Sequence, residues 1–169
     1  MISPMTNKKV AQLHPADYNP RIISDDQLGR LKKALAEYGD LGGVISNRTT
    51  GNLVGGHQRV KLFDKSWPIE LTATYDPERA DGTVAEGYVL GPEGTRFAYR
   101  EVAWPLAKEK AANIAANQHG GEFDMGVLKA ILVELDDGAF DLSLTGFDEK
   151  ELAAMIDRAA DVPMPDALP

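Results

Sequence analysis

The sequence predicts an α/β fold of the α+β type, with strands joined by hairpins and with capped helices. The 169 residues are 43% hydrophobic and 26% charged, which is the balance of a globular domain with a core. Strand-like segments flank glycine-containing turns. Several apolar segments with helical spacing begin at a capping residue. No segment has the ~18 consecutive apolar residues of a membrane span, so we expect no membrane partner.

The first elements follow from local patterns. Residues 10–13 read as a short strand, and the prolines in residues 14–21 indicate an ordered turn. A helix is predicted from the N-cap Ser24 to Tyr38, with Gln27 as the capping-box partner and Gly39 ending it.

Hairpins and helices alternate in the remainder. Residues 44–47 and 52–54 form one predicted hairpin, and residues 84–90 and 97–104 form another, with a strand at 69–75. Helices are predicted from 57 to about 63, from Pro105 to about Gln118, and from two Phe-Asp caps at Asp124 and Asp148. Residues 161–169 contain three prolines, and we expect a flexible tail there.

Charge and cysteine content exclude several classes of function. The chain has no cysteine, which excludes disulfides and thiolate chemistry and favours a cytoplasmic location. Its formal charge is −8, which argues against a general nucleic-acid coat. Residues 1–121 carry +1 and residues 122–169 carry −9, so the first part can still meet a phosphate or DNA locally. The acidic part either keeps the protein soluble or meets a basic partner.

The segment with the clearest chemistry is Gly55-Gly56-His57-Gln58-Arg59, where a predicted strand gives way to a helix. Backbone amides at a helix N-terminus favour an anion, and glycine lets a phosphate come close. Arg59 adds a guanidinium that can bind phosphate with two hydrogen bonds. The pattern predicts a phosphate cradle, and an ordinary turn is the alternative.

Four other polar positions are candidates. His57 could act as a general acid or base, or could form a local backbone bond. On the helix after Pro105, Asn113 and Asn117 share a polar face with Lys110, and we expect Ala107, Ala111, Ile114 and Ala115 to pack on the opposite face. That polar face is either a ligand contact or a solvated surface. No histidine or carboxylate stands near His57 at metal-ligand spacing, so we predict no metal site in the chain.

Read in order, these segments resemble the ParB/sulfiredoxin-like fold. Leu13-His14-Pro15 with Asn19-Pro20-Arg21 resembles the first box of that family, and Gly55-Gly56-His57-Gln58-Arg59-Val60 resembles its central box. Residues 113–117 with Phe123-Asp124 resemble the third box. The similarity spans about residues 10–157 and is strongest to ParB-like domains of phages and mobile elements that act with DNA methyltransferases.

The resemblance implies a small mixed sheet with flanking helices that binds a nucleoside triphosphate or diphosphate, namely CTP, ATP or ADP, with Mg²⁺ as a candidate. Gly55, Gly56 and Arg59 would hold phosphates, and His57 and Gln58 belong to the same box. Arg21 and Asn19 would lie beside the phosphates, and Asn113 and Asn117 near them or near a magnesium ion. Candidate partners are DNA, a DNA methyltransferase and a second copy of the chain.

Some positions depart from the family pattern. Partition ParB has glutamates where His57 and Ala116 stand here, and sulfiredoxin has its catalytic cysteine at the position of His57. Only about 45 residues follow the third box, and they are acidic. We therefore do not expect a basic recognition helix that reads DNA sequence.

We divide the chain into a nucleotide-binding domain over 8–121, an acidic helical extension over 122–160 and a tail over 161–169. The leading functional hypothesis is a ParB-like nucleotide-binding module of phage or mobile-element origin that acts in DNA modification or DNA handling. One alternative is a small kinase or NTPase that uses His57 at the same phosphate site. The other is a non-catalytic adaptor whose acidic helices dock on a DNA methyltransferase.

Overall fold

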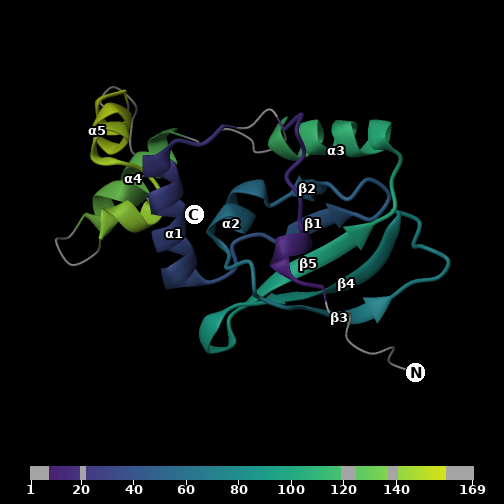
Figure 1. Cartoon of the computed structure of the whole chain (residues 1–169). Coiled ribbons are helices and arrows are strands. Elements are labelled where there is room, and N and C mark those ends of the chain that lie inside the picture. The colour runs from purple at the N-terminus through teal and green to yellow at the C-terminus, as the bar shows by residue number, and fades with distance from the viewer. Residues whose placement is uncertain (1–7, 20–21, 119–124, 137–140, 159–169) are drawn as a thin grey trace. The chain divides into compact units, whose positions relative to one another are not determined.

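The structure, a computed structural model, describes residues 8–19, 22–118, 125–136 and 141–158 (Figure 1). Its α-helices are α1 (Asp25–Tyr38), α2 (His57–Leu62), α3 (Leu106–Gln118), α4 (Met125–Leu135) and α5 (Glu149–Arg158). Its strands are β1 (Val44–Asn47), β2 (Leu53–Gly55), β3 (Ile69–Thr74), β4 (Thr83–Leu90) and β5 (Arg96–Val102). Three short 3₁₀ turns are η1 (Val10–Gln12), η2 (Pro92–Gly94) and η3 (Leu142–Thr145).

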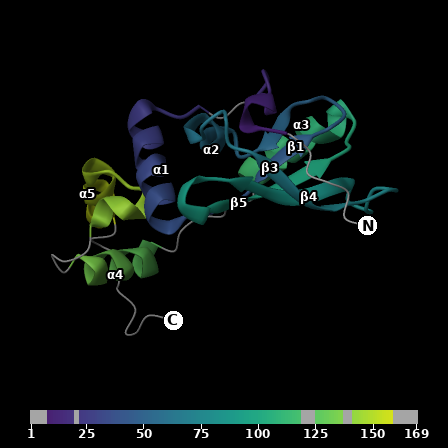
Figure 2. The same cartoon turned by 60° about the horizontal axis from the view of Figure 1, so that its bottom comes forward.

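The five strands form one mixed sheet in the order β2-β1-β5-β4-β3, which confirms the predicted fold class. Figure 1 labels all five strands, and Figure 2 shows the same sheet from another side. Both predicted hairpins are present as antiparallel pairs, β1 with β2 and β4 with β5. The first hairpin joins the second through a parallel pair, in which Val44 lies opposite Tyr99 and Asn47 opposite Val102. This pairing places the end of β1 beside the end of β5, close to the start of α3.

Both faces of the sheet are partly covered. Side chains alternate along β5, so Phe97 and Val102 lie on opposite faces. Phe97 packs on Phe63, which follows α2, with ring centroids 4.6 Å apart. Val102 is fully buried in a cluster with Val54 and Trp104, against which Ala112 of α3 packs. The turn from β2 into α2 is therefore held from both sides.

The prediction of a strand over residues 10–13 is wrong, because Val10–Gln12 form a 3₁₀ turn. The backbone N–H groups of Val10 and Ala11 donate to the carbonyls of Trp67 and Lys65, both at 3.0 Å. Trp67 and Lys65 lie in a loop rather than in a strand, so no ladder forms. The flanking residues Lys9 and His14 make isolated bridges, with Pro68 and Asn52.

The predicted start of α5 is confirmed by its side-chain hydrogen bonds. Asp148 accepts from the backbone N–H of Glu151 at 2.7 Å, and the Glu151 carboxylate accepts from the N–H of Asp148 at 2.8 Å. This is the predicted capping box of α5. The predicted cap Asp124 and the tail 161–169 lie outside the described residues. None of the helices in the described ranges is long and apolar enough to cross a bilayer.

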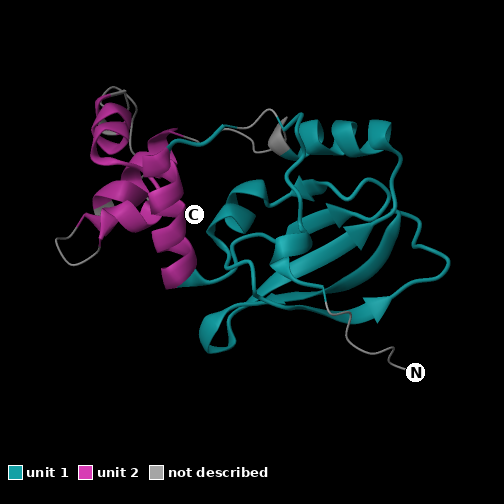
Figure 3. Cartoon of the chain, in the orientation of Figure 1, with its two compact units in different colours: residues 1–24, 38–119 teal, residues 25–37, 120–169 magenta. Residues whose placement is uncertain are grey.

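The chain divides into two compact units (Figure 3). One unit comprises residues 1–24 and 38–119, and it contains the sheet with α2 and α3. The other comprises residues 25–37 and 120–169, so most of α1 groups with α4 and α5 although it lies early in the sequence. The domain boundaries given above stay predictions.

Candidate functional site

The turn between β2 and α2 contains two glycines with different structural roles. Gly56 is the N-cap of α2 in the left-handed conformation, with φ 83°. A Cβ atom there would lie 3.0 Å from the carbonyl oxygen of Gly43 and 3.1 Å from the Cα of Val44, so the fold itself requires glycine. A Cβ on Gly55 would meet only Ile45, at 3.7 Å or more, which is ordinary contact. The packing of the chain therefore does not require a glycine at position 55.

The first turn of α2 directs backbone amides away from the helix. The N–H of Val60 donates to the Gly56 carbonyl at 3.0 Å, and this bond starts the helical pattern. The amides of the residues before Val60 have no acceptor within the helix, which is the general property of helix N-termini. Gln58 and Arg59 are both half-buried in this turn. The predicted succession of strand, glycine turn and helix is thus present.

Arg59 lies against a second glycine pair that precedes β1. A Cβ atom on Gly42 would stand 2.8 Å from Nη2 of Arg59, so the guanidinium reaches the backbone of this loop. The carboxylate of Asp40 holds the loop, since it accepts from the N–H of Gly42 at 3.1 Å and from that of Ala98 at 2.9 Å. Sequence reasoning did not identify Gly42, Gly43 or Asp40, because their relation to Arg59 is visible only in the fold.

His57 is buried, with 7% of its surface exposed. Its Nε2 atom accepts a hydrogen bond from the backbone N–H of Ala16 at 3.4 Å. Burial lowers the pKa of the imidazole, nearby Lys61 lowers it further, and Glu109 opposes the shift. The side chain is thus neutral near neutral pH, with its proton on Nδ1, and it holds the turn at residues 16–19 next to α2.

Asn113 connects α3 to the end of β2. The side chain is 2% exposed, and its Nδ2 donates to the carbonyl of Val54 at 3.1 Å. The prediction that Ala107, Ala111, Ile114 and Ala115 form the packing face of this helix is wrong. Ala107 and Ala111 are exposed and Ile114 is 55% exposed, whereas Glu109 and Asn113 point into the protein. The polar face packs inward because it meets polar partners there.

Those partners surround Glu109, which is fully buried and was not recognised in the sequence. Its carboxylate accepts from Asn47 at 2.5 Å, from Asn52 at 2.9 Å, and from the hydroxyls of Thr50 and Tyr18. Burial would raise the pKa of Glu109, but these four hydrogen bonds outweigh it, so the pKa lies below its usual value. The carboxylate ties α3 to the β1–β2 hairpin.

The other predicted residues are placed only in part. Asn19 is half-buried, and its backbone N–H donates to the Ala16 carbonyl at 3.0 Å, in the turn held by His57. Arg21 lies outside the described residues. Asn117 belongs to α3, but its side chain is not described. The described residues contain no group of three His, Asp or Glu side chains that could hold a metal ion.

The structure therefore brings three segments, far apart in sequence, to the β2–α2 turn. His57 connects the turn to residues 16–19, Asn113 connects it to α3, and Arg59 connects it to the loop before β1. Among the groups at this turn, the glycine pairs Gly42-Gly43 and Gly55-Gly56 and the guanidinium of Arg59 are suited to binding an anion.

Comparisons with known proteins give a fold and a partial family match. Residues 126–169 match the family model described as the ParB-methyltransferase HTH domain. A crystal structure of the C-terminally truncated chromosome-partitioning protein ParB from Caulobacter crescentus, complexed with CTP-gamma-S, is similar with a TM-score of 0.55. The alignment has 13% sequence identity and covers 97% of this chain and 81% of that chain. No curated protein sequence matches the chain.

The helix-turn-helix match falls on the acidic extension, where no basic recognition helix was expected. The matched range contains η3 and α5 and nearly all of α4. Sequence reasoning gave this range no such assignment, because a DNA-reading helix is expected to be basic and residues 126–169 have a formal charge of −7.

Proposed function

We propose that this chain, which has a ParB-like fold, binds a nucleotide at the β2–α2 turn and acts in DNA modification together with a methyltransferase. The phosphates would meet the amides of Gly56, His57 and Gln58, and the guanidinium of Arg59. These groups would contact phosphates and therefore do not distinguish one base or sugar from another. CTP, ATP and ADP are all candidate ligands. An origin in a phage or mobile element stays a prediction from the resemblance.

The observation that carries the proposal is the glycine at position 55, which the packing of the chain does not require. A side chain there would contact only Ile45 at ordinary distance, so the fold leaves this glycine free to serve a ligand. A phosphate that approaches a backbone needs such a position, since a Cβ would stand between the phosphate and the amides. Gly56 does not by itself indicate a ligand, because the packing of the chain already requires a glycine there.

Arg59 supports the same proposal through its placement. Its guanidinium lies beside Gly42, where again no side chain intervenes. A guanidinium binds two phosphate oxygens at once, and it supplies charge that backbone amides cannot. The similar ParB structure was solved with CTP-gamma-S, which makes a nucleoside triphosphate the first ligand to test.

His57 and Asn113 position the turn in this proposal and do not take part in chemistry. Both side chains are nearly fully buried and both bond to backbone groups. If Mg²⁺ accompanies the nucleotide, its ligands would be phosphate oxygens and water, since the described residues offer no cluster of metal ligands.

Isothermal titration calorimetry of the full chain with CTP, ATP, ADP and GTP, each with Mg²⁺, tests the proposal. At least one nucleotide should bind the wild type. Arg59→Ala should weaken binding about tenfold or more, because each 1.4 kcal/mol of lost interaction is a factor of ten. Gly55→Val should weaken it similarly by obstructing the phosphate.

Lys61→Ala is the matched control, because it removes one positive charge from the exposed side of the same helix. It should bind nucleotide nearly as the wild type does. Equal loss in Lys61→Ala and Arg59→Ala would mean that only general charge matters, and the absence of heat with every nucleotide would exclude the proposal.

A further inference from the structure

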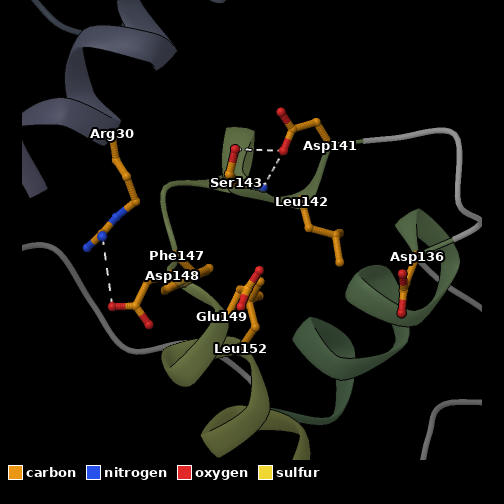
Figure 4. A pocket seen from close by; sticks show the side chains of 9 residues that line it. All are labelled: Arg30, Asp136, Asp141, Leu142, Ser143, Phe147, Asp148, Glu149 and Leu152. Atoms are coloured by element: carbon orange, nitrogen blue, oxygen red, sulfur yellow. Dashed lines mark hydrogen bonds and ion pairs between the residues drawn. The ribbon is translucent and has the colours of Figure 1, made fainter. Parts of the chain in front are cut away.

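A pocket lies within the C-terminal unit, between the 3₁₀ turn η3, the start of α5 and the end of α4 (Figure 4). Its volume is about 480 Å³. In the view of Figure 4, Arg30 of α1 and Asp136 lie at opposite ends of the pocket. All the lining residues belong to the same unit: Arg30, Asp136, Asp141, Leu142, Ser143, Phe147, Asp148, Glu149 and Leu152.

The backbone around the pocket is held by several hydrogen bonds. Asp141 caps η3 by accepting from the N–H of Ser143 at 3.0 Å and from its hydroxyl at 2.6 Å. Gly146 ends η3 in the left-handed conformation, with φ 88°, and its carbonyl accepts from Nε of Arg30 at 2.9 Å. The capping box of Asp148 then starts α5. The pocket is thus formed before any partner arrives.

The lining combines apolar side chains with uncompensated negative charge. Leu142, Phe147 and Leu152 supply the apolar part. Two of the four carboxylates have cations nearby, since Asp141 pairs with Lys33 at 2.5 Å and Asp148 lies 3.8 Å from Arg30. Within the described residues, Asp136 and Glu149 form no ion pair, so the pocket keeps a net negative charge.

DNA is an unfavourable occupant of this surface. A helix-turn-helix holds DNA by placing Lys and Arg beside phosphates. Among the exposed described side chains of α5, Glu149 and Asp157 are acidic, Ala153 and Ala154 are apolar, and Lys150 is basic. The exposed side chains of α4 that the structure describes are Ile131 and Val133, which are apolar. Apart from Lys150, phosphates would meet like charge and apolar surface on these described side chains.

We propose that this pocket docks a basic segment of a partner protein, so that the helix-turn-helix-like part of this chain binds protein rather than DNA. A lysine or arginine of the partner meets Asp136 and Glu149, and an apolar neighbour in the partner packs on Leu142 and Phe147. The proposal rests on a different unit from the nucleotide site, and either can fail without the other.

Fluorescence anisotropy of a labelled peptide that contains arginine and leucine, titrated with the full chain, tests the proposal. The peptide should bind, and binding should weaken as salt is raised. The double variant Asp136→Asn with Glu149→Gln should weaken binding about tenfold, which is about 1.4 kcal/mol. A peptide with glycine in place of leucine should also bind more weakly, because the apolar contact is lost.

Asp157→Asn is the matched control, since it removes one charge from an exposed position of α5 that does not line the pocket. Single Asp136→Asn should weaken peptide binding more than Asp157→Asn does. Equal effects of the two would contradict docking in the pocket. Binding of duplex DNA that competes with the peptide, or a double variant as tight as the wild type, would also overturn the proposal.

Discussion

The Nε2 atom of His57 accepts a hydrogen bond from the backbone N–H of Ala16, 3.4 Å away, across 41 residues of sequence. The bond requires a neutral imidazole, because a doubly protonated ring has no acceptor. It places the turn that contains Asn19 next to the first turn of α2. His57 therefore has a structural function, and a catalytic function of the same side chain would have to be compatible with this bond.

The buried histidine predicts a pH-dependent stability. Burial holds the pKa of His57 in the folded chain below 6.5, its ordinary value. As the pH falls below about 7, the histidine of the unfolded chain therefore takes up a proton before that of the folded chain does. The free energy of unfolding should therefore fall as the pH is lowered from 7.5 to about 5.5. Urea unfolding of the wild type and of His57→Gln at both pH values measures this. The variant should show a smaller decrease, and identical slopes would refute the assignment.

The two glycines of the turn should respond differently to alanine. Gly56→Ala should destabilise the chain by about 2 kcal/mol, because a left-handed residue gains a Cβ that presses on Gly43 and Val44. Gly55→Ala should cost about 0.5 kcal/mol or less. Chemical denaturation gives both values. Similar losses for the two would show that both glycines are required by packing alone.

The buried carboxylate of α3 should be important for stability. Glu109→Ala should lower the free energy of unfolding by about 3 kcal/mol, because Asn47, Asn52, Thr50 and Tyr18 lose their common acceptor. Thermal and urea unfolding measure the loss. Glu93→Ala is the control, since Glu93 is exposed in the turn between β4 and β5, and it should leave stability nearly unchanged. A Glu109 variant as stable as the wild type would contradict the network.

The helix that begins after Asp148 gives a smaller, local prediction. Asp148→Ala removes the acceptor for the N–H of Glu151 and should cost about 1 kcal/mol. Because the bond lies in the C-terminal unit, amide hydrogen exchange should speed up in α5 and remain unchanged in β5. Faster exchange in β5 as well would show that the two units unfold together.

Much of the fold is predictable because its signals are local. The capping box of Asp148 and Glu151 and the hairpin around residues 48–51 depend on residues a few positions apart. The strand predicted over 10–13 failed because the partners of Val10 and Ala11 are in a loop more than 50 residues away. The parallel pairing of β1 with β5 is equally distant and has no local signal.

The candidate site likewise contains residues that local sequence patterns predict and residues that only the fold reveals. The glycines and Arg59 were visible in the sequence, since a strand, a tight turn and a helix follow one another there. Glu109 was not, because its four donors come from positions 57 to 91 residues away and only the fold shows them. Unless those donors are known, the polar face of α3, which points into the protein, is predicted to be exposed.

The central claim is that phosphates bind the amides and the guanidinium at the β2–α2 turn. Two-dimensional ¹H–¹⁵N NMR of the full chain, titrated with CTP and Mg²⁺, tests it most directly. The amide signals of Gly56, His57 and Gln58 should shift, and these shifts should be lost in an Arg59→Ala chain that remains folded. Signals of this turn that stay unchanged at saturating nucleotide, or that shift equally in Arg59→Ala, would contradict it.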